Sequence, residues 1–401
     1  MMSLELSRRI RAISPSPTLS IDTKTKALLA EGIDVVNLSV GEPDFNTPDQ
    51  ASLAAISAII TNFTKYTPVP GIMELRKGIV NKLRTENELA YTPEEIIVSS
   101  GAKHSLYNIF MAILNPGDEV LLPAPYWVSY PEQIRLCEGV PVVLATDEST
   151  GFKVTPEQLE QAITPKTRAF LLNSPSNPTG AVYTPEEIRA IAAVLEKHDI
   201  YVVSDEIYEQ LTYGVEHYSI ARFSENMKSK TLVVNGFSKT FAMTGWRVGY
   251  VAGPLPIIKA MTSFQSHTTA NPASISQKAA VGALGTFDQE HVAEFQHRRD
   301  FVLGQLAELP GVICAKPEGA FYVFPNVRSW IGKTYTRANQ STIVVDSVDT
   351  LAELLLTDAN ISIVPGTGFG APDNFRISYA TSMEQLKKAM NRLSDFVSRL
   401  R

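Results

Sequence analysis

Lys239 and Arg247 are the residues of this chain whose chemistry is easiest to name. Lys239 ends the segment Gly236-Phe237-Ser238-Lys239, and Arg247 follows it by eight positions. A primary amine can hold an aldehyde cofactor as a Schiff base, and a permanent cation can hold the phosphate of that cofactor. Small residues around the lysine would let a flat ring approach the backbone. The segment therefore predicts an attachment site for pyridoxal phosphate. From these two residues alone, a lysine that only extends its amine to solvent is an open alternative.

The composition is typical of a globular enzyme. The chain has 401 residues, of which 44% are hydrophobic, and this length favours two domains over one. The net charge is -6 and the basic residues are scattered, which argues against nucleic acid or an anionic membrane as a partner. No segment reaches the length of a membrane span, and residues 1–11 lack the apolar core of a secretory signal. We therefore expect a cytoplasmic protein.

Cysteine and histidine give no sign of a disulfide framework or a metal site. Cys137 and Cys314 lie far apart and have no CxxC or histidine-spaced partner. The six histidines form no ligand pattern, so we expect no metal.

The lysine motif follows one of five short apolar segments that have the character of β-strands. Helix-like segments follow them, and this alternation predicts an α/β fold with a mostly parallel central sheet. Ligands bind at the carboxyl ends of the strands in such sheets. Because polar or aromatic residues follow all of these segments, we expect those residues to converge at one edge. The segments are 96–98, 119–122, 169–172, 200–203 and 232–234.

The character of the chain changes near residue 289. A charged helix-like segment begins there, an apolar helix with acidic residues follows at 346–358, and strand-like segments lie at 319–324 and 375–379. These predict a smaller α+β domain. Pro15, Pro17 and the loop Gly41-Glu42-Pro43-Asp44-Phe45 indicate an N-terminal arm that crosses between domains. We expect residues 1–45 to form the arm and part of the small domain, 46–288 the large cofactor-binding domain, and 289–401 the rest of the small domain.

With these landmarks in this order, nearly the entire chain resembles the class I aminotransferases, which are fold type I pyridoxal phosphate enzymes. It resembles more closely the prokaryotic-type aspartate aminotransferases, a subgroup that includes some prephenate aminotransferases. Ser16-Pro17-Thr18 and Lys103 match the arm and the helix start of that subgroup. The resemblance implies a fold type I architecture, pyridoxal phosphate as the cofactor, amino acid and 2-oxo acid substrates, and a homodimer with shared active sites.

The resemblance also assigns residues to the cofactor ring. Asp205 would face the pyridine nitrogen and keep it protonated, which makes the ring an electron sink. Asn177 and Tyr208 would donate hydrogen bonds to the phenolate oxygen, and Trp127 would stack on the ring. Trp127 and Asn177 would also border the substrate. From the residues alone, Asp205 is equally suited to cap a helix, and Asn177 to form a turn. Tyr208 and Trp127 are equally suited to a core.

The phosphate is expected at the start of the helix that begins near Gly101, where free backbone N–H groups attract anions. Arg247 would add a bidentate contact, and Ser238 is a further donor. By the resemblance, Tyr66 of the neighbouring subunit completes this site. The candidates at the helix start are Gly101, Ala102 and Lys103.

Arg376 matches the arginine that binds the α-carboxylate of the substrate in this family. A planar guanidinium suits a carboxylate because two parallel N–H bonds fix its orientation. Gly41 matches the loop glycine whose backbone lies near the same carboxylate. An edge-strand arginine and a turn glycine are the structural alternatives.

The distal carboxylate of a dicarboxylic substrate needs a different partner. Animal and enteric aspartate aminotransferases use an arginine after the cofactor lysine, but residues 266–271 contain none. Lys103 is the candidate, because a cation at a helix N-terminus opposes the helix dipole unless an anion lies nearby. The resemblance adds Ser16 and Thr18.

These roles predict transamination by a ping-pong mechanism, with Lys239 as the Schiff-base lysine and the proton-transfer base. L-Aspartate and 2-oxoglutarate are the expected pair, giving oxaloacetate and L-glutamate. The alternatives are a prephenate aminotransferase, another amino acid aminotransferase, or a fold type I lyase that uses nearly the same residues. A transcription regulator of this fold would need a DNA-binding module, for which the chain before Gly41 is too short.

Overall fold

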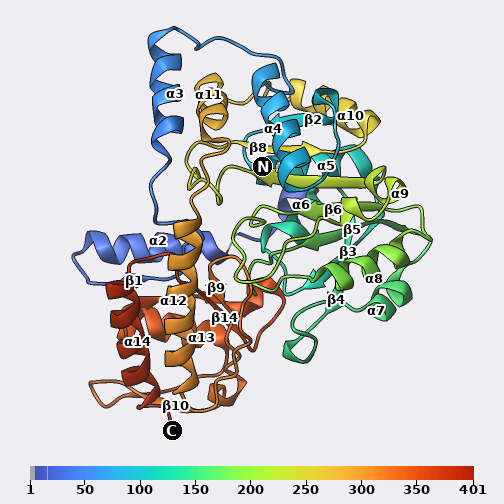
Figure 1. Ribbon diagram of the computed structural model, residues 1–401. Coiled ribbons are helices and arrows are strands. Elements are labelled where there is room, and N and C mark those ends of the chain that lie inside the picture. The colour runs from blue at the N-terminus through green and yellow to red at the C-terminus, as the bar shows by residue number, and fades with distance from the viewer. Residues whose placement is uncertain (1–4, 16) are drawn as a thin grey trace.

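A seven-stranded sheet forms the centre of the larger part of the molecule (Figure 1). The computed structural model describes residues 5–15 and 17–401. The strand order is β2-β8-β7-β6-β5-β3-β4, and only β8 runs antiparallel to its neighbours. The predicted α/β class with a mostly parallel sheet is therefore confirmed. The strands are β2 (Ile96–Ser99), β3 (Glu119–Ala124), β4 (Val140–Ala145), β5 (Thr167–Asn173), β6 (Tyr201–Asp205), β7 (Thr231–Gly236) and β8 (Gly249–Ala252).

Helices cover both faces of this sheet, which explains why its inner strands are apolar throughout. Side chains of a strand alternate between faces, so Ile97 of β2 packs with α5, α6 and α10, while Ile96 and Val98 pack with α3, α4 and α11. Farther along the sheet, Leu121 and Leu172 pack with α7 and α8. The helices are α3 (Asp49–Ile60), α4 (Met73–Glu86), α5 (Ala102–Ile113), α6 (Ser129–Leu136), α7 (Pro156–Ala162), α8 (Pro185–Leu195), α9 (Glu225–Lys228), α10 (Leu255–Ser266) and α11 (Ser274–Ala283).

Local sequence fixes where some of these helices begin. Thr184 precedes α8, and its hydroxyl accepts a hydrogen bond from the Glu187 backbone N–H at 3.2 Å. The Glu187 carboxylate accepts the Thr184 N–H at 2.8 Å, so the two residues form a capping box. The helix thus begins with its apolar residues Ile188 and Ile191 against the sheet.

The carboxyl ends of β2, β3, β5, β6 and β7 lie at one edge of the sheet, as the predicted topology requires. Register places Asn173 of β5 beside Asp205 of β6, and Asp205 beside Val234 of β7. β7 ends at Gly236, just before Lys239. The residues that follow these strands are therefore neighbours in space although they are distant in sequence.

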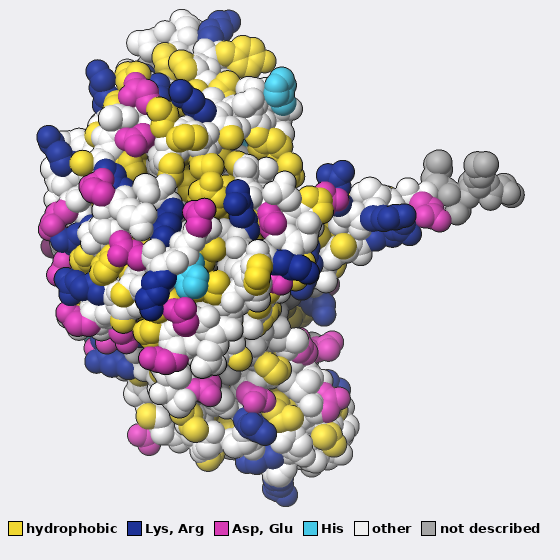
Figure 2. Space-filling model, turned by 90° about the vertical axis from the view of Figure 1, so that its right-hand side faces the viewer, with side chains coloured by type: hydrophobic (Ala, Val, Ile, Leu, Met, Phe, Trp, Pro, Cys, Tyr) yellow, Lys and Arg dark blue, Asp and Glu magenta, His cyan; other side chains and the backbone are white. Residues whose placement is uncertain are grey.

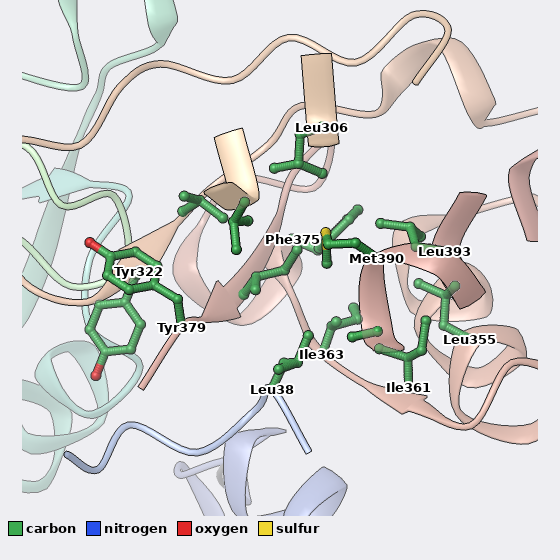
Figure 3. Close-up of a cluster of buried hydrophobic side chains, with 14 of the residues drawn as sticks. Leu38, Leu306, Tyr322, Leu355, Ile361, Ile363, Phe375, Tyr379, Met390 and Leu393 are labelled. Carbon is green, nitrogen blue, oxygen red and sulfur yellow. The ribbon is translucent and has the colours of Figure 1, made fainter. Parts of the chain in front are cut away.

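The smaller part of the molecule has its own apolar core (Figure 3). In that core Leu38, from the N-terminal part of the chain, packs with Ile361, Phe375 and Leu393. β1 also pairs in parallel with β12, which supports our proposed grouping of residues 1–45 with 289–401. The elements are β1 (Val36–Asn37), α12 (Gln289–Ala307), β9 (Tyr322–Val323), β10 (Thr334–Thr336), β11 (Thr342–Val344), α13 (Val348–Asp358), β12 (Ile361–Ser362), β13 (Val364–Pro365), β14 (Phe375–Ser378) and α14 (Met383–Val397).

The N-terminal segment touches both parts. α1 (Arg8–Arg11) lies in an arm that projects from the surface in Figure 2. The Ser14 N–H donates to Glu132 of α6 at 3.1 Å, and Thr25 of α2 (Pro17–Ala30) donates to Ser362 of β12 at 2.7 Å. Among the described residues, no helix has both the length and the apolar character needed to cross a membrane.

Candidate active site

The edge of the sheet and the smaller part of the molecule enclose a cavity of about 310 Å³. Its wall contains the side chains of four cationic residues and two carboxylates, so it favours an anionic ligand. Most residues that the sequence predicted for the site line it. They are Thr18, Gly41, Ala102, Lys103, Trp127, Asn177, Asp205, Tyr208, Ser238, Lys239, Arg247 and Arg376. The two carboxylates are Glu42 and Asp205.

Lys239 places its amine inside this cavity. The Nζ atom donates a hydrogen bond to the Gly41 carbonyl at 2.5 Å, and no carboxylate of the described residues forms an ion pair with it. Burial, together with the positive charge of Arg376, lowers the pKa of the Lys239 amine to about 8. A lysine with a lowered pKa is neutral more often near pH 7, and the neutral amine is the nucleophile.

Asp205 ends β6 and is almost fully buried, with 3% of its surface exposed. Its carboxylate accepts a hydrogen bond from the Tyr130 hydroxyl at 2.8 Å and one from the Ile207 N–H at 3.2 Å. Burial raises the pKa of Asp205 to about 6, and the Tyr130 hydrogen bond opposes this rise. A buried carboxylate of this kind would be stabilised by a cationic group of a ligand.

The start of α5 offers the cavity a place for an anion. Neither Ala102 nor Lys103 has a hydrogen-bond acceptor for its backbone N–H in the described part of the chain. Gly101 has φ +87°, and a Cβ there would collide with the Arg247 guanidinium. Arg247 itself is held by the Thr244 carbonyl at 2.7 Å. Free N–H groups beside a guanidinium form a binding site suited to a phosphate.

Arg376 of β14 is buried, with 2% of its surface exposed. It donates to the Asn177 side chain at 2.9 Å and to the Ser39 carbonyl at 2.6 Å. Within residues 5–15 and 17–401, its Nε has no acceptor and its guanidinium forms no ion pair. Burial lowers the pKa of Arg376. A buried charge without a counter-ion is costly, so this arginine favours a carboxylate ligand.

Aromatic side chains form the remaining wall. The Trp127 ring lies edge-on to Tyr130 at 5.3 Å, and the Lys103 ammonium is 4.9 Å from the Trp127 ring centre. The Tyr208 hydroxyl lies 2.8 Å from the Tyr322 hydroxyl, and both rings are buried. Flat walls with hydroxyl groups suit an aromatic ring with polar substituents.

Two predicted residues, Gly101 and Tyr66, are not among those that line the cavity. Because Gly101 has no side chain, the Arg247 guanidinium can lie close to its backbone. Tyr66 is 92% exposed. Ser16, which was also predicted for the site, lies outside the described residues.

The sequence prediction missed Tyr130, Tyr322 and Asn173, which also line the cavity. Tyr130 follows Trp127 by three positions, so the same strand-end argument that selected Trp127 could have selected it. Tyr322 lies in the segment 319–324, which the sequence assigned only to the smaller domain. No local pattern indicates that its hydroxyl reaches Tyr208.

These groups fit pyridoxal phosphate. The Lys239 amine can hold its aldehyde, the start of α5 with Arg247 can hold its phosphate, and Asp205 can face a protonated ring nitrogen. An α/β fold with these groups at the carboxyl edge of its sheet defines a pyridoxal phosphate enzyme of fold type I.

Comparison with known proteins identifies the family. The family described as aminotransferase class I and II matches residues 33–393. The aspartate aminotransferase of Geobacillus stearothermophilus is 48% identical over 399 residues, which cover 98% of this chain and 99% of that protein. The aspartate/prephenate aminotransferase of Cereibacter sphaeroides is 47% identical, with 98% and 99% covered. The crystal structure of the aspartate aminotransferase from Rhizobium meliloti has a TM-score of 0.94 and 44% identity, and covers 100% of both chains.

The chain therefore belongs to the class I and II aminotransferases. It is an enzyme, a transferase of amino groups, and its cofactor is pyridoxal phosphate.

Proposed function

We propose that this enzyme transfers the amino group of L-aspartate to 2-oxoglutarate, forming oxaloacetate and L-glutamate. The observation that carries the proposal is that Arg376 and Lys103 line the same cavity as Lys239, and neither forms an ion pair within the described residues. Two free cations suit a substrate with two carboxylates. The relatives named for aspartate, at 47% and 48% identity, support the same substrate.

In the proposed mechanism Lys239 moves the proton. When bound, pyridoxal phosphate stabilises negative charge at the substrate Cα. Once the amino group of the substrate has replaced it on the aldehyde, the freed Lys239 amine would take the proton from Cα and would hold it for return to the carbon that receives the amino group. A pKa of about 8 suits both directions, since the amine loses and gains a proton near neutral pH.

Other cavity residues hold the two reactants in place. Asp205 keeps the ring nitrogen protonated, and Tyr208 and Asn177 donate to the oxygen on the ring. Trp127 stacks on the ring and also borders the substrate together with Asn177. The phosphate is held at the start of α5, by Gly101, Ala102, Lys103, Ser238 and Arg247.

The substrate is oriented from both ends. Arg376 binds its α-carboxylate, with the Gly41 backbone close by. Lys103 binds the distal carboxylate, with Thr18 beside it and Ser16 as a further proposed contact. This arrangement favours aspartate over an amino acid with an apolar side chain.

The active unit is proposed to be a cytoplasmic homodimer. On α3, Leu53, Ile56 and Ile60 are 64%, 52% and 74% exposed and lie on one side of the helix. An exposed apolar stripe of this kind suits a protein interface. The exposed Tyr66 follows α3 and would reach the phosphate site of the second subunit.

Prephenate is the second candidate substrate, because the Cereibacter sphaeroides relative is named for both aspartate and prephenate. It also carries two carboxylates. Its reaction with glutamate would use the same Arg376 and Lys103.

A substrate comparison with Lys103→Met tests the proposal. Kinetics with aspartate, glutamate and alanine as donors, and with prephenate as an acceptor, would give kcat/KM for each. Loss of a charged hydrogen bond should lower kcat/KM for aspartate by about 10- to 100-fold and leave alanine unchanged. Lys77→Met on the surface of α4 is the matched control. Equal use of alanine and aspartate by the wild-type enzyme would reject the dicarboxylate assignment.

A further inference from the structure

Tyr322 lies between the residues proposed for the cofactor and those proposed for the substrate carboxylate. It belongs to β9 and is paired in register with Ser378 of β14, the strand that carries Arg376. Only 1% of its surface is exposed, yet it lines the active-site cavity. A Cβ on Gly41 would lie 2.5 Å from the Tyr322 hydroxyl, so this loop passes directly over it.

The ring and the hydroxyl of Tyr322 have different neighbours. The Arg376 guanidinium lies 4.5 Å from the centre of the Tyr322 ring and 5.3 Å from that of Phe369. Contacts with two aromatic rings restrict the orientation of this cation. The Tyr322 hydroxyl has Tyr208 as its hydrogen-bond partner, with 2.8 Å between the oxygens.

A hydroxyl has one hydrogen, so only one of these two tyrosines can donate to the other. If Tyr208 donates to Tyr322, it has no hydrogen for an anionic ligand oxygen. If Tyr322 donates, the hydrogen of Tyr208 is available to the cavity. Among the described residues, the Tyr322 hydroxyl has no hydrogen-bond partner other than the Tyr208 oxygen. The buried hydrogen of Tyr322 is therefore satisfied only when Tyr322 donates to Tyr208. A hydroxyl that accepts a hydrogen bond in this way is also a stronger donor.

We propose that Tyr322 is a positioning residue with two separable tasks. Its hydroxyl donates to Tyr208, so that Tyr208 presents its own hydrogen to the oxygen on the cofactor ring. Its ring holds the Arg376 guanidinium in the plane that receives the substrate carboxylate. The second task rests on the proposed function, whereas the first requires only bound pyridoxal phosphate.

Tyr322→Phe and Tyr322→Leu separate the two tasks, and Tyr379→Phe is the matched control. Tyr379 is a buried tyrosine of the same core whose hydroxyl contacts Tyr213 and the Ala320 carbonyl instead. The readouts are the pH midpoint of the visible absorbance of the bound cofactor, the Kd of succinate, and kcat and KM for aspartate. Thermal unfolding of each holoenzyme checks that the variants fold.

We expect Tyr322→Phe to raise the pH midpoint by about 0.1 to 0.3 unit and to lower kcat by about 2-fold, because Tyr208 keeps its own hydrogen but loses the hydrogen bond that polarises its hydroxyl. Its Kd for succinate should stay at the wild-type value, because the ring remains. Tyr322→Leu should also raise the KM for aspartate and the Kd of succinate by about 2- to 30-fold, the range of a cation–π contact.

An unchanged midpoint in Tyr322→Phe, or an equal shift in Tyr379→Phe, would overturn the hydroxyl task. Succinate binding that is unchanged in Tyr322→Leu would overturn the ring task. Failure of the wild-type enzyme to use aspartate would instead reject the proposed function. The absorbance midpoint could still be compared between wild type and Tyr322→Phe in that case.

Discussion

Asp205 shows how a single residue depends on one neighbour. Its carboxylate is buried, which favours the protonated form, while the Tyr130 hydroxyl at 2.8 Å favours the ionised form. The folded-state pKa of about 6 lies above the usual value for an aspartate. Folding stability therefore falls as the pH rises from the usual pKa toward 6, because the buried carboxyl group must ionise. A cationic ring nitrogen would offset that cost, and this is why we propose that Asp205 faces the cofactor.

The variant Tyr130→Phe tests this balance. Without the hydroxyl, the pKa of Asp205 should rise by about 0.7 unit, the equivalent of one hydrogen bond. Cofactor binding needs the ionised carboxylate. When the pH is lowered, the cofactor affinity of Tyr130→Phe should therefore begin to fall at a higher pH than that of the wild-type enzyme. Titration of the apoenzyme with pyridoxal phosphate between pH 5 and 8, followed by protein fluorescence, measures the shift. Superimposable pH profiles for the two proteins would refute the role of Tyr130.

At the scale of elements, the N-terminus of α5 and the Arg247 loop act as one unit. A Cβ at Gly101 would displace the Arg247 guanidinium, and the φ of +87° at this position also favours glycine. Arg247 also has a positive φ of 53°, which is unusual for a residue other than glycine. The fold therefore holds the guanidinium against the helix start at some conformational cost.

Gly101→Ala should weaken cofactor binding, and Gly117→Ala is a matched control. Gly117 has φ +86°, nearly the same as Gly101, but an added Cβ there meets nothing within 4 Å. Both changes should cost about 1 kcal/mol of stability through the backbone. Only Gly101→Ala should raise the Kd of pyridoxal phosphate, by about 10-fold or more, because it displaces a charged contact. Equal cofactor affinities in the two variants would show that the approach of Arg247 to Gly101 is irrelevant to binding.

The sequence predicted the main strands and the start of α12 because the apolar and charged patterns that define them lie within short segments. The five predicted strand segments overlap β2, β3, β5, β6 and β7, with ends that differ by up to two residues, and α12 begins at Gln289 as expected. β4 and β8 were not predicted. β4 is apolar in sequence but contains Pro141, and β8 begins with Gly249; proline and glycine both weaken the pattern of a strand.

The sequence predicted those site residues that lie in a local motif with a recognisable chemical group. It did not predict site residues that are defined by long-range contacts. Lys239, Asp205 and Arg376 were found because an amine, a carboxylate and a guanidinium follow recognisable segments. Tyr322 meets Tyr208 across a separation of 114 residues, and nothing in either local sequence encodes that contact. The tertiary packing of the smaller part on the larger one creates it.

For the whole molecule, the central question is whether two chains share each active site. Tyr66 is exposed and does not line the cavity of its own chain, and α3 carries an apolar stripe. We propose that the second subunit receives Tyr66. Each site would then combine Lys239 of one chain with Tyr66 of the other.

Mixed dimers test this arrangement. Lys239→Ala and Tyr66→Ala enzymes should each have little activity. Random reassortment of the two, by dissociation and reassembly, should restore about a quarter of the wild-type sites, because half of the dimers are hybrids with one intact site. Activity after mixing that merely equals the average of the separate variants would contradict shared sites. Sedimentation analysis of both variants confirms that dimers are compared with dimers.

The most direct test of the whole account is a single-turnover experiment without an amino acceptor. Holoenzyme is mixed with aspartate alone, and the oxaloacetate released is counted per active site, with Lys239→Ala as the control. The account predicts a burst of about one oxaloacetate per site, no further product until 2-oxoglutarate is added, and no burst in the variant. Continuous product without an acceptor, or no oxaloacetate from a fully loaded enzyme, would contradict aspartate transamination by this protein.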